Sequence, residues 1–398
     1  MITPPSEAYV YEAIRLPRAR VKKAGGTLAG VAAHELLAQL LRELERRSPA
    51  ASTAEDVVIG VSTVHGEHAG DVARVAVQAA GWDDGIPAGV VSRMCCSGLD
   101  AIGSVASRIR AGDADLLVAG GVESMSRVPM FSDRASMALD PEVAALSGFV
   151  TIGVSADLTA LKYGFRRAEL DEYVVRSHER ALAAPAWQHV VPVVVDDEVL
   201  LATDEGARPG TTLESLAALS PLFGNDSGWD LVEARFPEVR RPEVGLHTVA
   251  SAPQMCDGAS VALLGSRTAE DHLGAAPIGR VVGYAHTAVR SPMLDATVGA
   301  VSQVLDRAGL TTHDVDLFEI NESFSVTPLL AVRELGLDLD RVNPYGGAVA
   351  LGHPLGASGG LLLAEALEAL GERGGRYAVL AIPAALGVAS AMLVERLS

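Results

Sequence analysis

Cysteine is scarce in this sequence: three residues, Cys95, Cys96 and Cys256, occur among 398. So few thiols cannot form a disulfide framework, and without a CxxC pair we expect no structural zinc site and no other metal site. Positive charge is also low, with 32 Lys and Arg against 50 Asp and Glu and a net charge of −18. Nucleic acids and anionic membrane surfaces bind basic faces, so neither is an expected partner.

The sequence also lacks a strong membrane signal. Its first residues have no apolar stretch of the kind that signal peptides carry, which predicts a cytoplasmic protein. Residues 377–394 run uncharged for 18 residues, the lower limit of a membrane span. Because Pro383 and Gly387 interrupt this run, two buried strands at 379–382 and 388–394 are a better interpretation than a membrane-spanning helix.

What is abundant is apolar sequence in an alternating pattern. Apolar residues make up 49% of the chain, enough for a packed core, and the length fits two or three domains or one large α/β assembly. Helical and strand-like segments alternate, as in layered α/β proteins. The expected helices are 27–44, with Thr27 as N-cap, 71–80 and 97–111, and the expected strands are 57–62, 88–92 and 115–119.

The C-terminal third repeats the pattern of the first. Residues 314–320 resemble residues 56–62, and Ser97-Gly98 and Ser358-Gly359 each open a helix about twenty residues before the next strand. Two copies of one β/α unit are therefore expected, with a site where they meet. The region 122–250 between them, rich in Pro, Gly and charge around helices near 153–162 and 169–184, is predicted to cover that site.

Two residues stand out for their chemistry. Cys95 lies between a short strand and a helix start, where the helix dipole favours a thiolate nucleophile; a buried structural cysteine is the alternative, and the structural role is expected for Cys96. His353 is surrounded by glycines, where an imidazole can accept a thiol proton, unless it only completes a tight turn. Asn321-Glu322 follows the strand 314–320, either as site residues or as a helix cap.

Five motifs occur together in one order. They are Cys95-Cys-Ser-Gly-Leu, Ala119-Gly-Gly-Val-Glu-Ser-Met-Ser, Arg208-Pro-Gly-Thr-Thr-Leu-Glu, Asn321-Glu-Ser-Phe and Gly352-His-Pro. In this combination the sequence resembles the thiolase family from about residue 12 onward. The resemblance implies an α/β fold of five layers (αβαβα), built from two βαβαβαββ halves at 1–270 and 271–398, with an inserted loop domain at about 122–250. It also implies acyl-CoA substrates, no permanently bound cofactor, and a homodimer or homotetramer.

The resemblance also assigns roles to single positions. Cys95 is similar to the acyl-accepting nucleophile, His353 to its activating base and a donor to the thioester oxygen, and Asn321 to the residue that holds a water in that oxyanion hole. Arg208 and Ser215 match positions that contact the nucleotide of coenzyme A, and an arginine suits the CoA phosphates.

The sequence departs from the family pattern at its end. The family's second catalytic cysteine, which moves a proton at the α-carbon, is Ala381 here, and the glycine whose N–H completes a second oxyanion hole is Pro383. A missing general base commonly costs about 10²–10⁴ in rate, and a missing oxyanion donor about 10²–10³. On the CoA side Asp257-Gly258 is kept, but Pro253 stands where a serine is common.

Three hypotheses follow. The chain is an acyltransferase that still performs Claisen-type carbon acyl transfer by a non-standard route, for example with Cys96 as a substitute base. Alternatively, acyl-Cys95 passes its group to an amine, an alcohol or water. In the third hypothesis the chain is a catalytically silent homologue that binds a partner. The first is the leading hypothesis because the resemblance extends over nearly the whole chain.

Overall fold

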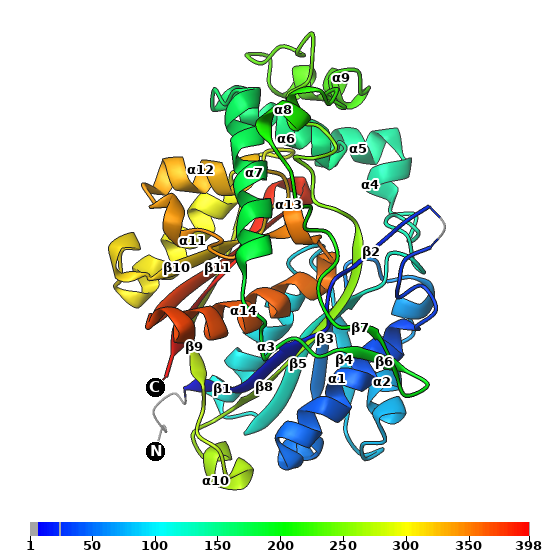
Figure 1. Cartoon of the computed structure of the whole chain (residues 1–398), viewed down its shortest axis with the longest axis vertical. Helices are drawn as coiled ribbons and strands as arrows, with labels where there is room; N and C mark the ends of the chain where they lie inside the picture. The colour runs from blue at the N-terminus through cyan, green and yellow to red at the C-terminus, as the bar shows by residue number, and fades with distance from the viewer. Residues whose placement is uncertain (1–6, 24, 398) are drawn as a thin grey trace.

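A large mixed β-sheet forms the centre of the computed structural model, which describes residues 7–23 and 25–397 (Figure 1). Within these residues ten strands lie in the spatial order β10-β11-β12-β9-β1-β8-β5-β3-β4, with β2 paired to β8. Every residue of β5 and of β8 is buried, as expected for strands covered on both faces. The strands are β1 (Ala8–Arg15), β2 (Ala19–Arg20), β3 (Val57–Gly60), β4 (Ala88–Val91), β5 (Leu116–Glu123), β8 (Cys256–Gly265), β9 (Gly279–Ala288), β10 (Leu317–Ile320), β11 (Tyr377–Ala384) and β12 (Val388–Arg396).

The two halves of the sheet repeat one chain path. In the first half β4, β3 and β5 are parallel, and β8 and β1 follow antiparallel to their neighbours. In the second half β10 and β11 are parallel, and β12 and β9 follow in the same way. The counterpart of β4 is reduced to a single bridge between Phe318 and Val342, so the second half lacks one full strand of the expected repeat. Pairing of β1 with β9 joins both halves.

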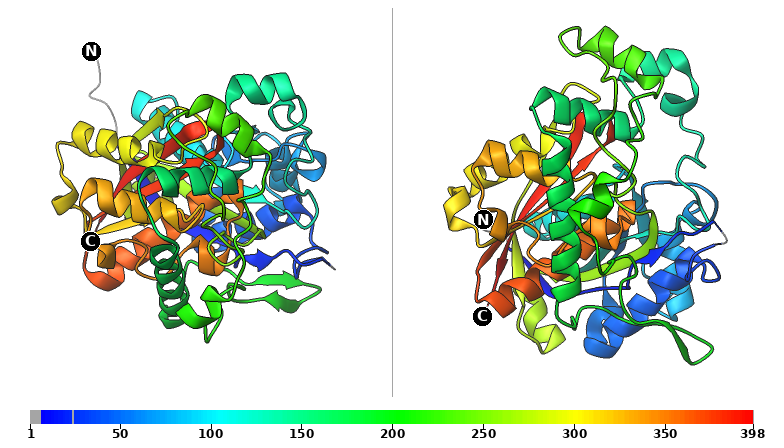
Figure 2. Two further views of the ribbon diagram at one scale, coloured as in Figure 1. Left: turned by 90° about the horizontal axis from the view of Figure 1, so that it is seen from above. Right: turned by 45° about the horizontal axis from the view of Figure 1, so that its top comes forward.

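Helices divide the apolar core into three layers. One pair covers the outer face of the first half, a second pair covers the outer face of the second half, and a third pair lies between the halves (Figures 1 and 2). The pair on the outer face of the first half is α1 (Ala33–Arg47) with α2 (Val72–Ala80), and the pair on the outer face of the second half is α11 (Ala296–Ala308) with α12 (Val326–Leu335). The pair between the halves is α3 (Ser97–Ala111) with α14 (Ser358–Arg373). The expected five-layer α/β fold is confirmed.

Small residues allow the two central helices to touch at their first turns. A Cβ on Gly98 would lie 2.5 Å from the carbonyl oxygen of Gly356, and one on Gly359 would lie 2.1 Å from the backbone nitrogen of Leu99. No side chain fits at these distances, which explains the glycine after the first serine of both helices. The crossing brings together the two loops that precede α3 and α14.

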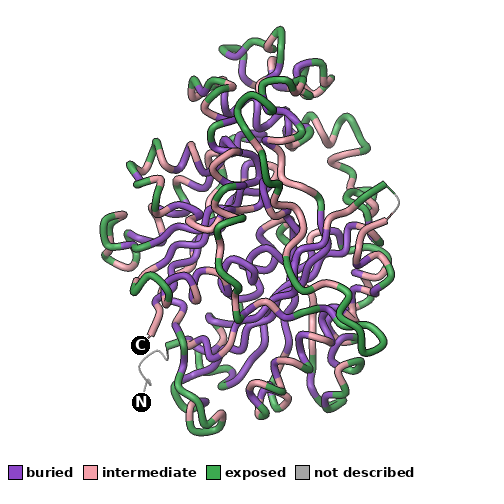
Figure 3. The backbone as a smooth tube through the Cα atoms, viewed as in Figure 1, coloured by how far each residue is buried: buried purple, intermediate pink, exposed green. Residues whose placement is uncertain are grey.

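The helices α4, α5, α6, α8 and α9 of the chain between β5 and β8 lie at the upper end of the molecule in Figure 1, while α7 runs down its front and β6 and β7 lie at the lower right. Much of this upper region is more exposed than the central layers (Figure 3). The chain between β5 and β8 was expected to act as a cover, but its helices also enclose small apolar clusters of their own, one of them around Trp229 and Phe236. Its elements are α4 (Ser136–Leu139), α5 (Pro141–Ser147), α6 (Ile152–Lys162), α7 (Arg167–Ala183), β6 (Val193–Val195), β7 (Glu198–Leu201), α8 (Leu213–Ala217) and α9 (Gly228–Arg235). Two further short helices, α10 (Ala269–Leu273) and α13 (Ala348–Leu351), lie later in the chain.

Two sequence predictions can be compared directly with these bounds. The apolar run 377–394 forms β11 and β12 around a turn, as predicted. The helix predicted from Thr27 is wrong at its start, because the Thr27 hydroxyl donates to Glu205 (2.7 Å) and α1 begins only at Ala33. By length and composition alone, the helical residues Pro141–Lys162 could cross a membrane. They form two helices, α5 and α6, and 56% of their most apolar 18-residue stretch is buried inside the protein, as core helices of soluble proteins also are.

Candidate active site

Cys95 lies in the turn between β4 and α3, directly before Cys96, the N-cap of the helix. The turn passes through Met94 with φ 49°, in the left-handed region that side chains rarely adopt. The Ser97 hydroxyl holds the turn, because it accepts from the Arg93 backbone N–H (2.8 Å) and donates to the Met94 carbonyl (2.6 Å). Cys95 is thereby fixed, half-buried, in the wall of a cavity.

The thiol of Cys95 is neutral at rest. Burial raises its pKa, and the nearby Cys96 and Glu123 add to the rise. This direction is opposite to the one expected from the helix start, and its first cause is desolvation of the thiolate by burial. A neutral thiol can act as a nucleophile only if a nearby base accepts its proton.

His353 lies in the wall of that cavity, in the loop between α13 and α14. Its backbone N–H donates to the Gln254 carbonyl (2.9 Å). Its Nδ1 hydrogen-bonds the Ser358 hydroxyl (2.8 Å), and the Asn321 amide Nδ2 lies 3.5 Å from its Nε2. Because Nδ2 is a donor, Nε2 accepts and Nδ1 carries the ring proton. Burial, helped by the charge of Arg18, lowers the pKa of His353 to about 3, so the imidazole is neutral.

Asn321 lies behind His353 and outside the residues that line the large cavity. Its backbone N–H donates to the Ala381 carbonyl (2.8 Å), which fixes the end of β10 against β11.

Glu322, the residue directly after Asn321, has a structural role. Its carboxylate is buried and accepts hydrogen bonds from the Tyr173 hydroxyl (2.7 Å) and the Val349 backbone N–H (2.8 Å).

Ser323 is a site residue that the sequence reasoning missed. Its hydroxyl lines the cavity, accepts from the Asn321 amide (2.9 Å) and donates to the Pro383 carbonyl (3.2 Å). It therefore holds the side chain of Asn321 next to His353. Its only signal in the sequence was its place directly after Asn321-Glu322, and its partner Pro383 lies 60 positions away.

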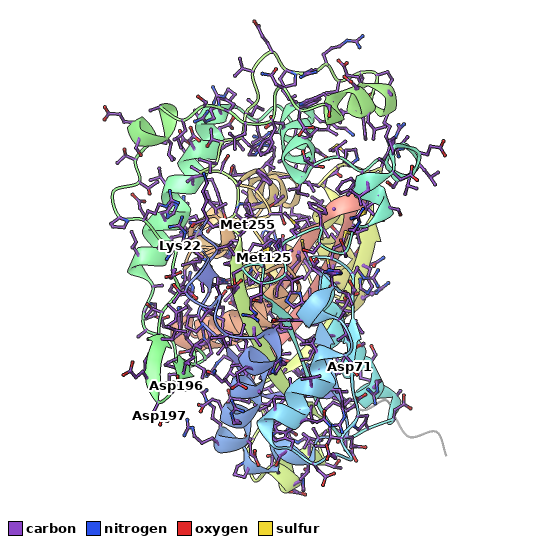
Figure 4. All side chains as sticks on the ribbon, turned by 90° about the vertical axis from the view of Figure 1, so that its right-hand side faces the viewer. Lys22, Asp71, Met125, Asp196, Asp197 and Met255 are labelled. Carbon is purple, nitrogen blue, oxygen red and sulfur yellow. The ribbon has the colours of Figure 1, made fainter. Side chains whose placement is uncertain are left out.

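The cavity has a volume of about 380 Å³ and mostly apolar walls. Met125 and Met255, from opposite ends of the segment between β5 and β8, lie close to each other there (Figure 4). Among the described residues, no group of three His, Cys, Asp or Glu side chains is placed to hold a metal ion. The described residues that line it are Ser62, Thr63, Met94, Cys95, Met125, Met130, Phe131, Asp133, Met137, Phe149, Thr151, Ile152, Gly153, Phe223, Ala252, Pro253, Gln254, Met255, Ser323, Phe324, His353, Leu355, Pro383 and Ala385.

The two residues expected to contact coenzyme A lie outside this lining. Arg208 is exposed, and its backbone N–H donates to Nδ1 of His178 (3.1 Å). The backbone carbonyl of Gly206, two residues earlier, accepts from Gln254 Nε2 (3.2 Å), which ties this segment to the cavity rim. Ser215 is exposed in α8, where its hydroxyl donates to the Thr212 carbonyl (2.8 Å) as part of a capping box. Their role in binding stays a prediction.

The positions that depart from the family pattern are also clear in the structure. Ala381 is fully buried in the core layer of α11 and is not among the cavity-lining residues, whereas Pro383 and Ala385 are. Cys96 is fully buried and its thiol donates to the Ile382 carbonyl (3.2 Å). Burial also raises the pKa of the Cys96 thiol to about 12, so this residue is structural and does not replace the lost base.

Comparisons with known proteins show which family the chain belongs to. Residues 11–230 match the family described as "Thiolase, N-terminal domain", and residues 275–396 match "Thiolase, C-terminal domain". The chain belongs to the thiolase family. It is 36% identical over 419 residues to the Escherichia coli beta-ketoadipyl-CoA thiolase (98% of this chain, 99% of the relative). It is 33% identical over 409 residues to the Bacillus subtilis 3-ketoacyl-CoA thiolase (98% and 99%).

The fold is also similar to that of a solved thiolase-family structure. The Bacillus anthracis acetyl-CoA acetyltransferase superposes with a TM-score of 0.86 and 28% identity, covering 99% of this chain and all of that one. This thiolase-family protein is therefore an acyl-CoA acyltransferase.

Proposed function

We propose that the chain takes an acyl group from acyl-CoA onto Cys95 and that His353 accepts the thiol proton in this step. The observation that carries the proposal is that Cys95 and a neutral His353 line one cavity. Asn321, held by Ser323, hydrogen-bonds His353 and supports an oxyanion site for the thioester oxygen. The substrate is a coenzyme A thioester, and no permanently bound cofactor takes part.

Claisen-type carbon acyl transfer needs a second proton transfer, at the α-carbon, and His353 alone is able to perform it. In the cleavage direction, the Cys95 proton passes to Nε2 as the sulfur attacks the 3-keto carbon of a 3-ketoacyl-CoA. The C2–C3 bond breaks, its electron pair goes to C2, and the imidazolium returns the proton to that carbon. The CoA thiol then attacks acyl-Cys95, and its proton travels through His353 to the Cys95 sulfur. This is Claisen-type chemistry in reverse, by a non-standard route with one imidazole.

A second candidate function is acyl transfer to an amine, an alcohol or water. It is favoured by the cavity wall near Pro383, which offers no backbone N–H, and by the position of Ala381 outside the lining. Neither an α-carbon base nor a second oxyanion donor is needed for such acceptors. The name of the Escherichia coli relative refers to an adipyl group, which ends in a carboxylate. No Lys or Arg is among the described residues that line the cavity of this protein, so the proposal does not include that substrate.

Further parts of the proposal concern coenzyme A and assembly. Arg208 and Ser215 contact the CoA nucleotide, and the chain assembles as a homodimer or homotetramer. The half-buried edge strand β4, directly before Cys95, supports a second copy at this edge. The three cysteines are free, which supports a cytoplasmic location.

Thiolysis of acetoacetyl-CoA by free CoA tests the proposal against the second candidate. Formation of two acetyl-CoA, lost in both Cys95→Ser and His353→Gln, is the expected result. Acylation of Cys95 without thiolysis, followed by transfer to water or an added amine, would instead establish the second candidate. If Cys95 takes up no acyl group at all, the chain is a silent homologue and both candidates are wrong.

A further inference from the structure

One wall of the cavity is formed by sulfur and aromatic side chains from the segment that contains α4 and α5. We call Met130, Phe131, Met137 and Phe149 the methionine–phenylalanine wall. The rings of Phe131 and Phe149 meet edge to face with centroids 6.0 Å apart. Met130 is 37% and Phe131 44% exposed, which is high for large apolar side chains. Such side chains gain free energy when an apolar group covers them, and methionine adapts its shape to that group.

Basic groups lie next to the part of the rim formed by Gln254 and Met255. Gln254 and Met255 line the cavity there, and β2, which contains Arg20, pairs with β8 directly after Met255. Lys22 lies close by (Figure 4), and the backbone two residues before Arg208 accepts a hydrogen bond from Gln254. Because the CoA phosphates are anionic, the nucleotide belongs on this rim. An acyl chain that starts at Cys95 then extends away from it, toward the methionine–phenylalanine wall.

Among its described lining residues the cavity has no Lys or Arg to pair with a carboxylate on that chain. The titratable side chains among its described lining residues are Cys95, Asp133 and His353, of which His353 is neutral. Asp133 belongs to the same segment as the methionine–phenylalanine wall and repels an anion. Arg18, behind the site, already forms ion pairs with Asp204 (3.1 Å) and Glu365 (2.8 Å). A carboxylate against these mostly apolar walls would lose part of its hydration without gaining an ion pair, which is costly.

We propose that the acyl group accepted by Cys95 is a neutral apolar chain lying against the methionine–phenylalanine wall, and that chains ending in a free carboxylate are rejected. This inference rests on the proposed function of Cys95 and adds its substrate class.

Hexanoyl-CoA and adipyl-CoA provide a matched test, since both acyl chains have six carbons and only adipyl ends in a carboxylate. The rate of acylation of Cys95 is followed by intact-protein mass with each. Hexanoyl is expected to acylate Cys95 faster by on the order of 100-fold, the factor that corresponds to an unpaired buried polar group. Equal rates, or faster acylation by adipyl, would overturn the inference and leave the proposed function standing. No adduct with either would refute the proposed function itself.

Exposed Met130 offers a matched pair of variants that should not disturb the core. Met130→Arg places a cation on the methionine–phenylalanine wall, and Met130→Gln has a similar length without charge. Met130→Arg is expected to raise the adipyl-to-hexanoyl rate ratio by about tenfold, the effect of one hydrogen bond to a charged group, while Met130→Gln leaves it unchanged. A ratio that does not move in Met130→Arg, with hexanoyl acylation intact, would show that the chain lies elsewhere.

Discussion

The Nδ1 atom of His353 lies 2.8 Å from the hydroxyl oxygen of Ser358, the first residue of α14. This bond holds the orientation of the imidazole ring. The start of α14 thus orients the proposed base, just as the start of α3 follows the proposed nucleophile, and the pair of glycines that lets the two helices cross brings both groups to one cavity.

Ser358→Ala is expected to slow acylation of Cys95 by about tenfold, because one hydrogen bond of about 1 kcal/mol no longer holds the imidazole ring in place. The effect belongs to the acylation rate constant and leaves the acyl-CoA concentration at half-saturation unchanged. Rapid-mixing mass measurements at several acyl-CoA concentrations separate the two. Ser358→Thr, which keeps the hydroxyl, serves as the control. A change confined to half-saturation would contradict the assigned role.

Burial lowers the pKa of His353 to about 3, below its unfolded value of 6.5. Between these values the unfolded chain binds more protons, so the stability that depends on a neutral His353 is complete above pH 6.5 and is lost as pH falls. From about pH 7.5 to about pH 5 the loss from this one group is about 2 kcal/mol. Urea unfolding at both pH values should show a smaller loss in His353→Gln than in wild type. Equal losses would mean that His353 is not buried as a neutral base.

Ala381→Cys alone is not expected to restore the proton transfer at the α-carbon that the second cysteine performs in the family. Residue 381 lies in the core layer of α11 outside the cavity lining, and Pro383 still offers no N–H. Acetoacetyl-CoA thiolysis should rise less than about tenfold, out of the 10²–10⁴ that a general base contributes. Ala381→Ser, similar in size, is the control for packing. Full recovery in Ala381→Cys would refute the account of Pro383.

Glu322→Ala tests whether the residue beside Asn321 is structural. Its carboxylate is buried and satisfies the Tyr173 hydroxyl and the Val349 N–H, so its loss leaves buried donors unpaired. We expect the free energy of unfolding to fall by about 3 kcal/mol, against almost no change for the exposed Glu214→Ala. An unchanged unfolding curve with lost acylation would instead make Glu322 a catalytic residue.

The parts of the site that follow from short stretches of chain could be predicted from the sequence. The strand, turn and helix around Cys95, the glycine-rich loop of His353 and the repeat of Ser97-Gly98 at Ser358-Gly359 are local patterns. What depends on distant partners could not. The start of α1 moves because Thr27 bonds Glu205, and Ser323 matters because it touches Pro383. The raised pKa of Cys95 results from burial by the whole fold, which no local pattern records.

The central claim is that Cys95 accepts the acyl group, and intact-protein mass tests it most directly. The protein is mixed with acetyl-CoA and, separately, with longer acyl-CoAs, and its mass is compared with that of Cys95→Ser under the same conditions. The account predicts a gain of one acyl group in wild type and none in the variant. No gain with any acyl-CoA, or an equal gain in Cys95→Ser, would contradict it.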